Sequence, residues 1–573
     1  MLPGSMLKPL LILAYLLCDY QTAIERIGSV GLSPALVVFA FLYLLLGAGL
    51  FAAARISNVW IRTLFAALLA AGSIFQHAFE WTTSGALTYE SFIDLYNAAD
   101  QTGDAMAQHG HVLLKVVPVA LLLFFGIALP SRRAPRWPRV WPKVWPWLPV
   151  TAPLAALGLL CALLYVRGGE GSRALPAAYP PLAFAGLLLE ESLKGDHGPR
   201  KPVTLPRAPV PLTKDIVLLV DESVAGNYVD IDNPKGVKTG LLDPHPGVRL
   251  TNFGYAASIH SCSANSNVVL RHGGTRETYQ EAMMRQPSIW AYGHKAGLRT
   301  IYIDAQSTGG HLQNLMTPAE RSEIDELIQF DKVPVIDRDM EIARVLAEHI
   351  NNGKPEFIYI NKVGAHFPIQ DKYPDRYMKY QPVLERGHFK NITWLIGRPG
   401  FNGTPPEWLR FRNTYRNVLL WNVGEFFHRL FATADLNKAT IVYTSDHGQD
   451  LHERGNPGRN NHCAHGISEQ EEGLVPLMIM EGDKSTSLDW NAHLAETHNG
   501  LSHYRIFPTL LTLMGYDRNA MKPFYGPALD EGGSDDFSYN VVFYNYLGRK
   551  PEFRRIDRKA IVDPPVSDYS SGQ

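Results

Sequence analysis

The chain has 573 residues, and its 54 lysines and arginines nearly balance its 55 aspartates and glutamates, which leaves a formal net charge of −1. This length exceeds that of one ordinary domain, and the near-neutral charge argues against a nucleic-acid binder, because such domains carry a strong basic excess. With 46% hydrophobic and 19% charged residues, the composition is not that of a disordered protein. Four cysteines in the whole chain exclude a disulfide-dense scaffold.

The first third of the chain holds apolar stretches long enough to cross a bilayer. Four of them approach the roughly 20 residues that a hydrocarbon core requires, namely Ser33–Ala54, Val59–Phe79, Val112–Leu129 and Leu148–Val166. Pro9–Cys18 is shorter and allows two interpretations, a fifth span or a signal peptide. No small-residue cleavage site follows it cleanly, and Asp19 interrupts the apolar run at once.

Charge sets the expected topology of these spans. The loop Ser131–Lys143 carries five basic residues and no acidic one, so the positive-inside rule places it in the cytoplasm. The last span then runs outward, and everything after Arg167 lies on the outer side. A cytoplasmic N-terminus requires an odd number of spans, which favours Pro9–Cys18 as the fifth. Tyr89–Ala107, on the outer side, is either an amphipathic surface helix or a plain connector.

The composition changes along the chain suggest four parts. Residues 1–167 form the transmembrane domain, and residues 168–212 form a linker rich in Pro, Gly and Arg, with a short surface-lying helix at Leu182–Leu189. Residues 213–550 form a large exported domain, and residues 551–573 are a C-terminal tail. About 340 residues are enough to bury a large core without disulfide support.

From Lys214 onward, short β-rich runs alternate with helical patterns. The expected strands are Ile216–Val220, Thr300–Ile303, Phe357–Ile360, Thr440–Tyr443, Leu474–Met480 and Val541–Tyr546. The expected helices are Thr278–Lys295, Arg338–Asn351, Trp408–Phe431 and Ile506–Met514. Continuous apolar strands between helices indicate an α/β fold, with a mostly parallel sheet covered by helices on both faces. In such sheets the chemistry gathers at the carboxyl ends of the strands.

Carboxylates and imidazoles follow several of these strands. Glu222 comes two residues after the end of the first strand, and His366 comes shortly after Phe357–Ile360. Asp446 and His447 come after Thr440–Tyr443, and His465 lies further along the same stretch. Gathered at one sheet edge, these nitrogen and oxygen ligands suit one or two Zn²⁺ ions.

A second set of residues extends the same sheet edge. The stretch Asp304–Ser307 follows another strand and is expected to shape the substrate pocket. Asn227 comes soon after Glu222 and either binds a head group or makes a turn. His462 is close to His465 in sequence and either replaces it or is an exposed loop histidine.

Several motifs resemble those of the alkaline phosphatase/sulfatase superfamily. The strongest match is Tyr443-Thr444-Ser445-Asp446-His447-Gly448 followed by Ala464-His465-Gly466. Further similar motifs are Asn413-Thr414-Tyr415-Arg416-Asn417, Ser502-His503 and Gly364-Ala365-His366-Phe367-Pro368. Within the superfamily, the chain looks most like the bacterial inner-membrane phosphoethanolamine transferases. That resemblance implies five N-terminal spans and a zinc-dependent periplasmic domain of the alkaline phosphatase/sulfatase-like fold.

The resemblance also assigns roles to individual residues. Glu222, Asp446, His447 and the nucleophile would bind the catalytic zinc. His366 and His465 would hold a second zinc or the phosphoryl oxygens and so contact the substrate. Asn227 is added to the substrate side for its position after Glu222, not for the resemblance.

The nucleophile is expected in the stretch Ser261–Ser266. The family spacing Thr-x-Thr-x-x-Ser, laid on this stretch, selects Ser263, whereas alignment on the cysteine selects Ser266, and Ser261 remains a third choice. A zinc-bound hydroxyl has a lowered pKa and attacks phosphorus in line. Cys262 lacks the Pro and Arg that formylglycine sulfatases have after their cysteine, so that chemistry is not expected. A disulfide between Cys262 and Cys463 is permitted in an oxidising compartment.

The resemblance implies a function for the whole chain. A multi-pass protein of the bacterial inner membrane would transfer phosphoethanolamine from a phospholipid donor, phosphatidylethanolamine, to lipid A or another envelope glycan. The transfer would pass through a covalent phospho-serine intermediate. Two alternatives stay open. The same fold can serve a phosphoglycerol transferase or phosphodiesterase, and the altered nucleophile stretch leaves room for a non-catalytic sensor or scaffold.

Overall fold

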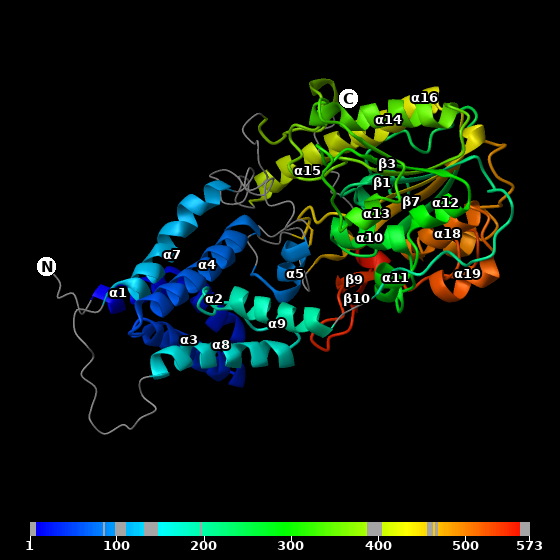
Figure 1. The fold of residues 1–573 in the computed structure, drawn as a ribbon. Coiled ribbons are helices and arrows are strands. Elements are labelled where there is room, and N and C mark those ends of the chain that lie inside the picture. The colour runs from blue at the N-terminus through cyan, green and yellow to red at the C-terminus, as the bar shows by residue number, and fades with distance from the viewer. Residues whose placement is uncertain are drawn as a thin grey trace, which may run out of the picture. The chain divides into compact units, whose positions relative to one another are not determined.

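The computed structural model describes residues 7–83, 86–97, 110–130, 147–194, 198–386, 404–454, 462–463 and 468–561. The chain divides into two compact units (Figure 1). Unit 1 comprises Met1–Asp196 together with Asn545–Lys550, and unit 2 comprises His197–Tyr544 together with Pro551–Gln573.

Unit 1 is helical in its described residues. Its α-helices are α1 (Leu7–Cys18), α2 (Tyr20–Val30), α3 (Pro34–Ala53), α4 (Val59–Thr83), α5 (Tyr89–Asn97), α7 (Leu113–Ala128), α8 (Leu148–Val166) and α9 (Pro180–Lys194). Four of the described helices are long and apolar enough to cross a membrane: Pro34–Ala53, Val59–Thr82, Gly110–Ala128 and Leu148–Val166. The pair α1 and α2 passes the same test together but is bent by 53°. The structure therefore confirms that the predicted apolar stretches form four to five helices long enough to cross a membrane.

The helices of unit 1 pack in pairs. α4 packs against α7, α3 against α8, and α1 against α7, while α9 contacts α8 and α4. The surface-lying helix expected at Leu182–Leu189 is longer, because α9 extends to Pro180 and Lys194, and its Ala183 and Phe184 are buried rather than exposed. The predicted amphipathic stretch Tyr89–Ala107 begins as α5, but residues 98–109 lie outside the described part. The basic loop Ser131–Lys143 also lies outside it.

Unit 2 is built on one large sheet. Its strands are β1 (Asp215–Asp221), β2 (Arg249–Ala257), β3 (Arg299–Asp304), β4 (Glu326–Gln329), β5 (Glu356–Asn361), β6 (Ala439–Ser445), β7 (Leu474–Glu481) and β8 (Leu501–Ser502), in the order β4-β3-β5-β1-β6-β7-β2-β8. Strands β9 (Ser538–Val542) and β10 (Glu552–Arg555) form a separate antiparallel pair. The sheet is mostly parallel, as predicted, although β7 runs antiparallel to both β6 and β2.

Helices cover both faces of this sheet (Figure 1). One face carries α14 (Val335–Asn351), α15 (Pro405–Leu419), the π-helical turn η7 (Leu420–Glu425) and α16 (Phe426–Thr433). The other carries α10 (Ser263–His272), α11 (Tyr279–Arg285), α12 (Ile289–Lys295), α13 (Pro318–Arg321), α18 (Ile506–Leu513) and α19 (Arg518–Tyr525). A short helix α17 spans Leu494–Thr497.

Strand β1 shows why both faces are covered. Val217 and Leu219 point into the core on the α14–α16 face, and Ile216, Leu218 and Val220 point into the core on the α10–α12 face. Every residue of β1 is buried, which is the pattern of a central parallel strand.

Two predicted helices differ from the structure. Thr278–Lys295 was expected as one helix but forms α11 and α12, because Pro287 cannot continue a helix and Ser288 caps the second one. Trp408–Phe431 continues as helix throughout but passes through the π-helical turn η7.

Candidate active site

Parallel pairing of β1 and β6 brings the first acidic residues of the site together. Asp221 is the register partner of Ser445, so Glu222 and Asp446 leave the sheet side by side. The backbone N–H of Asp446 donates a hydrogen bond of 2.9 Å to the carbonyl of Asp221, which extends the ladder to the end of both strands. The two carboxylates are therefore placed by the central strands of the sheet and not by a free loop.

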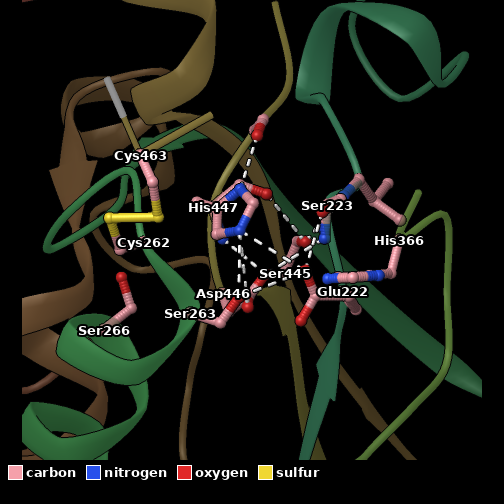
Figure 2. A network of polar contacts seen from close by, with 12 residues as sticks. Glu222, Ser223, Cys262, Ser263, Ser266, His366, Ser445, Asp446, His447 and Cys463 are labelled. Carbon is pink, nitrogen blue, oxygen red and sulfur yellow. Dashed lines mark hydrogen bonds and ion pairs between the residues drawn. A yellow bond between two sulfur atoms is a disulfide. The ribbon is translucent and has the colours of Figure 1, made fainter. Parts of the chain in front are cut away.

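Glu222, Asp446 and His447 form a compact buried group (Figure 2). One ligand atom from each side chain lies within 4.8 Å of the others. His447 Nε2 is 3.4 Å from Glu222 Oε1 and 3.7 Å from Asp446 Oδ2. All three side chains are completely buried.

The donor set fits a metal ion. Asp446 Oδ1 accepts hydrogen bonds from the backbone N–H groups of Ser223 and His447, whereas Oδ2 is buried and has no hydrogen-bond partner in the described part of the chain. His447 Nδ1 lies 2.6 Å from the carbonyl of Gly448, which leaves Nε2 facing the carboxylates. A buried carboxylate oxygen without a partner is costly unless a cation binds it. These three residues can therefore hold a metal ion.

The electrostatics of the group point the same way. Burial alone would raise the pKa of Glu222, but hydrogen bonding to His447 and electrostatic interactions with His366 and His447 hold it well below its ordinary value. Burial, and next the charge of Glu222, raise the pKa of Asp446 well above its ordinary value. Burial would lower the pKa of His447, but the charges of Asp446 and Glu222 outweigh burial and raise it to about 9. A divalent cation would relieve this crowding of negative charge.

Of the three candidate nucleophiles, Ser263 lies beside this group. It is the first residue of α10, and Cys262 occupies the N-cap position. Its Oγ is 3.2 Å from Glu222 Oε1 and 3.2 Å from His447 Nε2. The N-terminus of a ten-residue helix presents unpaired N–H groups and a positive dipole end, which stabilise negative charge on a bound phosphoryl group.

The other two serines of the stretch have different surroundings. Ser266 Oγ donates to the carbonyl of His260 at 3.0 Å and accepts from its N–H at 3.1 Å, so this hydroxyl braces the loop. Ser261 is buried, and its carbonyl accepts a hydrogen bond of 3.1 Å from the N–H of Cys463. Of the three hydroxyls, the structure brings that of Ser263 into hydrogen-bond distance of Glu222 and His447.

Cys262 and Cys463 are joined by a disulfide, with their Cα atoms 4.8 Å apart (Figure 2). The bond links positions 201 residues apart in the chain. It therefore ties the start of α10, which carries Ser263, to the stretch that follows β6. The sequence permitted this pairing without establishing it.

The turn after Glu222 is held by residues that sequence analysis did not select. Ser223 has a positive φ of 59° and donates from Oγ to Glu222 Oε1 at 2.7 Å. Tyr415 Oη accepts from the N–H of Ala225 at 2.8 Å and donates to the carbonyl of Ser223 at 2.7 Å. The family-like motif at 413–417 was visible in the sequence, but this contact across 192 residues was not.

Gln306 completes the surroundings of Glu222. Its Nε2 donates to Glu222 Oε2 at 2.9 Å and to the carbonyl of Lys362 at 2.8 Å. The strand-end position of Asp304–Ser307 had indicated a place at this edge, and the structure shows that Gln306 orients the carboxylate.

The loop after β5 places His366. Gly364 has a φ of +51°, and a Cβ there would lie 2.5 Å from the carbonyl oxygen of Glu222, so only glycine fits this close approach. The N–H of Ala365 donates to that same carbonyl at 2.8 Å. Burial, and in addition the charge of Lys372, lower the pKa of the His366 imidazole, which favours its neutral form.

The remaining expected residues have different outcomes. His462 is half-buried, with its ring stacked on that of His447 at 4.6 Å and 5.9 Å from the ring of His366. Asn227 is fully buried in the turn η4 (Gly226–Tyr228), where its carbonyl accepts from Asn233 Nδ2 at 2.7 Å. His465 lies outside the described residues.

A mostly parallel sheet whose central strands deliver two carboxylates and a histidine to a serine at a helix N-terminus is the arrangement of the alkaline phosphatase/sulfatase class of α/β proteins. The family model described as sulfatase matches residues 214–516, more than half of the chain. The chain therefore belongs to the sulfatase family.

Two similar proteins are named as bacterial phosphoethanolamine transferases. The chain is 24% identical over 185 residues to phosphoethanolamine transferase EptA of Escherichia coli O157:H7, and this match covers 30% of the chain and 30% of that relative. It thus spans less than a third of the length of the curated relative. The solved structure of the integral membrane protein lipooligosaccharide phosphoethanolamine transferase A of Neisseria meningitidis is 18% identical, with a TM-score of 0.63 over 89% of this chain and 95% of that chain. Most of the chain therefore has a fold similar to that of this solved structure.

Proposed function

We propose that the protein is an enzyme that transfers phosphoethanolamine from a phospholipid donor, phosphatidylethanolamine, to lipid A or another envelope glycan. The observation that carries this proposal is the position of Ser263 Oγ, 3.2 Å from both Glu222 and His447 at the start of a helix. The transferred group is taken from the two similar proteins, which are named as phosphoethanolamine transferases. Apolar spans suit an enzyme whose donor is a lipid.

Ser263 acts as the nucleophile in this proposal. Its hydroxyl loses a proton, and Oγ attacks the phosphorus of the donor phosphodiester in line with the bond to diacylglycerol. That P–O bond breaks, and diacylglycerol leaves with a proton on its oxygen. Phosphoethanolamine stays covalently attached to Ser263. A hydroxyl or phosphate oxygen of the acceptor then attacks the same phosphorus, and Ser263 is released with its proton restored.

Glu222, Asp446, His447 and Ser263 would hold the catalytic Zn²⁺, which when bound would lower the pKa of the serine hydroxyl and neutralise the phosphoryl oxygens. The chain's own groups supply the rest. Glu222 accepts from the serine hydroxyl, and the N–H groups at the start of α10 face the developing charge.

His366 and His465 are proposed to bind phosphoryl oxygens or a second Zn²⁺. His366 fits this role because burial and the nearby Lys372 favour its neutral, ligating form. Asn227 is also proposed to contribute to substrate binding, by shaping the turn that follows Glu222.

The proposed location is the bacterial inner membrane. Residues 1–167 would form the multi-pass membrane domain, residues 168–212 the linker, residues 213–550 the catalytic domain in the periplasm, and residues 551–573 the tail. The basic loop Ser131–Lys143 and the apolar spans support this orientation.

Labelled lipids test the proposal. The full chain, purified in detergent, is incubated with phosphatidylethanolamine carrying a label in the ethanolamine, and in parallel with head-group-labelled phosphatidylglycerol. We expect the protein to become labelled by the first lipid alone. Removing the metal with a chelator before the incubation should prevent labelling, and adding zinc back should restore it. Label from phosphatidylglycerol would indicate the phosphoglycerol transferase, and label from neither would indicate a non-catalytic protein.

The acceptor can be identified by comparing cells with and without the protein. Mass spectrometry of envelope lipids and glycans, with and without the protein, should show one species that gains phosphoethanolamine. A purified enzyme that becomes labelled while no envelope species changes would contradict transfer to lipid A or a glycan.

A further inference from the structure

The imidazole ring of His462 packs against His447, a residue of the candidate active site. Its ring is stacked on His447 with centroids 4.6 Å apart and planes inclined by 27°, and it lies 5.9 Å from the ring of His366. His447 in turn lies 3.2 Å from Ser263 Oγ. His462 therefore packs directly against the histidine that contacts the nucleophile.

The nitrogens of His462 do not belong to the metal group. Among the described residues, the ligand atoms that lie within 4.8 Å of one another come from Glu222, Asp446 and His447 alone. His462 Nδ1 is buried and has no hydrogen-bond partner among the described residues. A buried ring nitrogen without a partner costs free energy that a ligand with an oxygen acceptor would recover.

The disulfide explains how His462 is held there. Cys463 follows it directly, is bonded to Cys262, and donates its N–H to the carbonyl of Ser261 at 3.1 Å. Cys463 has a φ of +59°, a left-handed conformation that L side chains rarely adopt and that surrounding structure must enforce. The cross-link and the backbone hydrogen bond thus fasten His462 to the same loop that carries Ser263.

We propose that His462 is an additional catalytic residue that donates a hydrogen bond to a phosphoryl oxygen of the donor, and that the Cys262–Cys463 disulfide is the device that positions it. This inference rests on the proposed phosphoryl transfer at Ser263. The hydrogen bond acts on charge that grows in the transition state, in a site that is already largely dehydrated.

A double-mutant cycle on the full chain in detergent tests both parts. The enzymes compared are wild type, His462→Ala, His462→Gln, the pair Cys262→Ser with Cys463→Ser, and the triple variant with His462→Ala. Each is assayed for kcat/KM of transfer from phosphatidylethanolamine and for zinc per chain. His311→Ala, an exposed histidine in unit 2, is the matched control.

His462→Ala should lower kcat/KM by about tenfold to a hundredfold, the usual effect of one hydrogen bond to a charged group, with zinc content unchanged. His462→Gln, which keeps a donor, should recover part of the loss. The cysteine pair variant should lose at least as much as His462→Ala, and the triple variant should lose no more than the cysteine pair, because the disulfide acts through His462.

Any of three outcomes would overturn the inference. The first is a kcat/KM of His462→Ala equal to that of His311→Ala, and the second is a loss of zinc from His462→Ala. The third is a loss of kcat/KM in the triple variant that equals the product of the losses in the His462→Ala and cysteine pair variants. A wild-type enzyme that transfers no phosphoethanolamine would instead reject the proposed function, so the two failures are told apart.

Discussion

Ser263 and Ser266 are three positions apart in the chain, but their hydroxyls make entirely different contacts. The hydroxyl of Ser263 meets Glu222 and His447, whereas that of Ser266 is satisfied by both backbone groups of His260. At the residue scale, reactivity is therefore decided by what each hydroxyl contacts and not by the motif spacing that admits both.

Ser263→Ala should abolish covalent labelling and lower transfer by roughly a thousandfold or more, because the attacking atom is removed. Ser263→Thr should retain labelling, since it keeps a hydroxyl. Labelling by head-group-labelled phosphatidylethanolamine and transfer rates measure both.

Ser266→Ala is the matched control. It should keep its labelling while costing about 1 kcal/mol of stability from the lost hydrogen bonds to His260. Labelling that persists in Ser263→Ala and disappears in Ser266→Ala would move the nucleophile to Ser266.

Helix α15 acts on the site at the scale of an element. It carries Tyr415 to the turn after β1, where the hydroxyl satisfies one N–H and one carbonyl of the backbone. Tyr415→Phe leaves both groups buried and unpaired, which should cost about 1–3 kcal/mol. It should also loosen Glu222 and weaken zinc binding. Thermal unfolding and zinc titration of the purified chain measure the two effects.

Tyr373→Phe provides the control for Tyr415→Phe. Tyr373 is fully buried too, but its hydroxyl has no hydrogen-bond partner among the described residues, so its removal should be close to neutral. Equal losses in the two variants would show that Tyr415 contributes bulk and not its hydroxyl.

The end of helix α10 carries a buried charge cluster that makes stability depend on pH. Arg271 pairs with Glu320 at 2.6 Å, and Arg200 lies 3.2 Å from His272 Nε2. Burial, with Arg200 and Arg271, lowers the pKa of His272 despite the opposing charge of Glu320. The folded chain therefore keeps His272 neutral where the unfolded chain takes up a proton, so stability is present above the unfolded pKa of about 6.5 and is lost as pH falls below it.

Between pH 7.5 and 5.5 the unfolded chain takes up a proton at this position more readily than the folded chain, so the stability of the wild type should fall. His272→Asn cannot titrate, so its melting temperature should fall less over the same interval than that of the wild type. Thermal unfolding of the full chain in detergent at both pH values makes the comparison. Identical pH dependence in the two proteins would show that His272 binds protons equally in the folded and unfolded states.

The elements that sequence analysis found and missed differ in one physical respect. The strands β1, β3, β5 and β6 are buried on both faces, so their runs of Val, Ile, Leu and Tyr are continuous and visible. Strand β2 contains polar residues and a register shift between Asn252 and Tyr255, and β8 has two residues, so neither leaves such a run. Helix α10 begins with Ser-Ala-Asn-Ser-Asn, which is not the composition of a strong helix former.

The site residues likewise include some that could be predicted from the sequence and some that could not. The ends of neighbouring parallel strands meet at one edge, so Glu222, Asp446 and His447 could be placed together from the sequence, and the motif spacing brought Ser263 to them. Gln306 and Tyr415 reach Glu222 and its turn from 84 and about 190 residues away, a proximity that only the packed fold creates. The catalytic roles of all these residues stay predictions.

At the scale of the whole molecule, the chain passes between the two units more than once. Asn545–Lys550 belongs to unit 1, although the residues on both sides of it belong to unit 2. Within unit 1, the ring of Tyr546 lies 5.2 Å from that of Tyr89, and the N–H of Leu547 donates to Glu191 at 2.8 Å. Unit 2 is therefore connected to unit 1 not only through the segment near Asp196 but also through this short return segment.

Tyr546→Ala should lower activity on a lipid substrate without lowering activity on a small water-soluble substrate. Tyr546 is buried, and truncating a buried aromatic side chain costs about 3–5 kcal/mol of the contacts that retain the return segment in unit 1. Because Ser263 and the metal group belong wholly to unit 2, hydrolysis of a small water-soluble phosphodiester and zinc content should stay at wild-type levels, while transfer from phosphatidylethanolamine in micelles should fall. Phe524→Ala, at an exposed aromatic residue of α19, should change neither activity. Equal loss of both activities in Tyr546→Ala would mean that the segment supports the catalytic unit itself, and no loss in either would mean that the return segment does not restrain the enzyme on its lipid substrate.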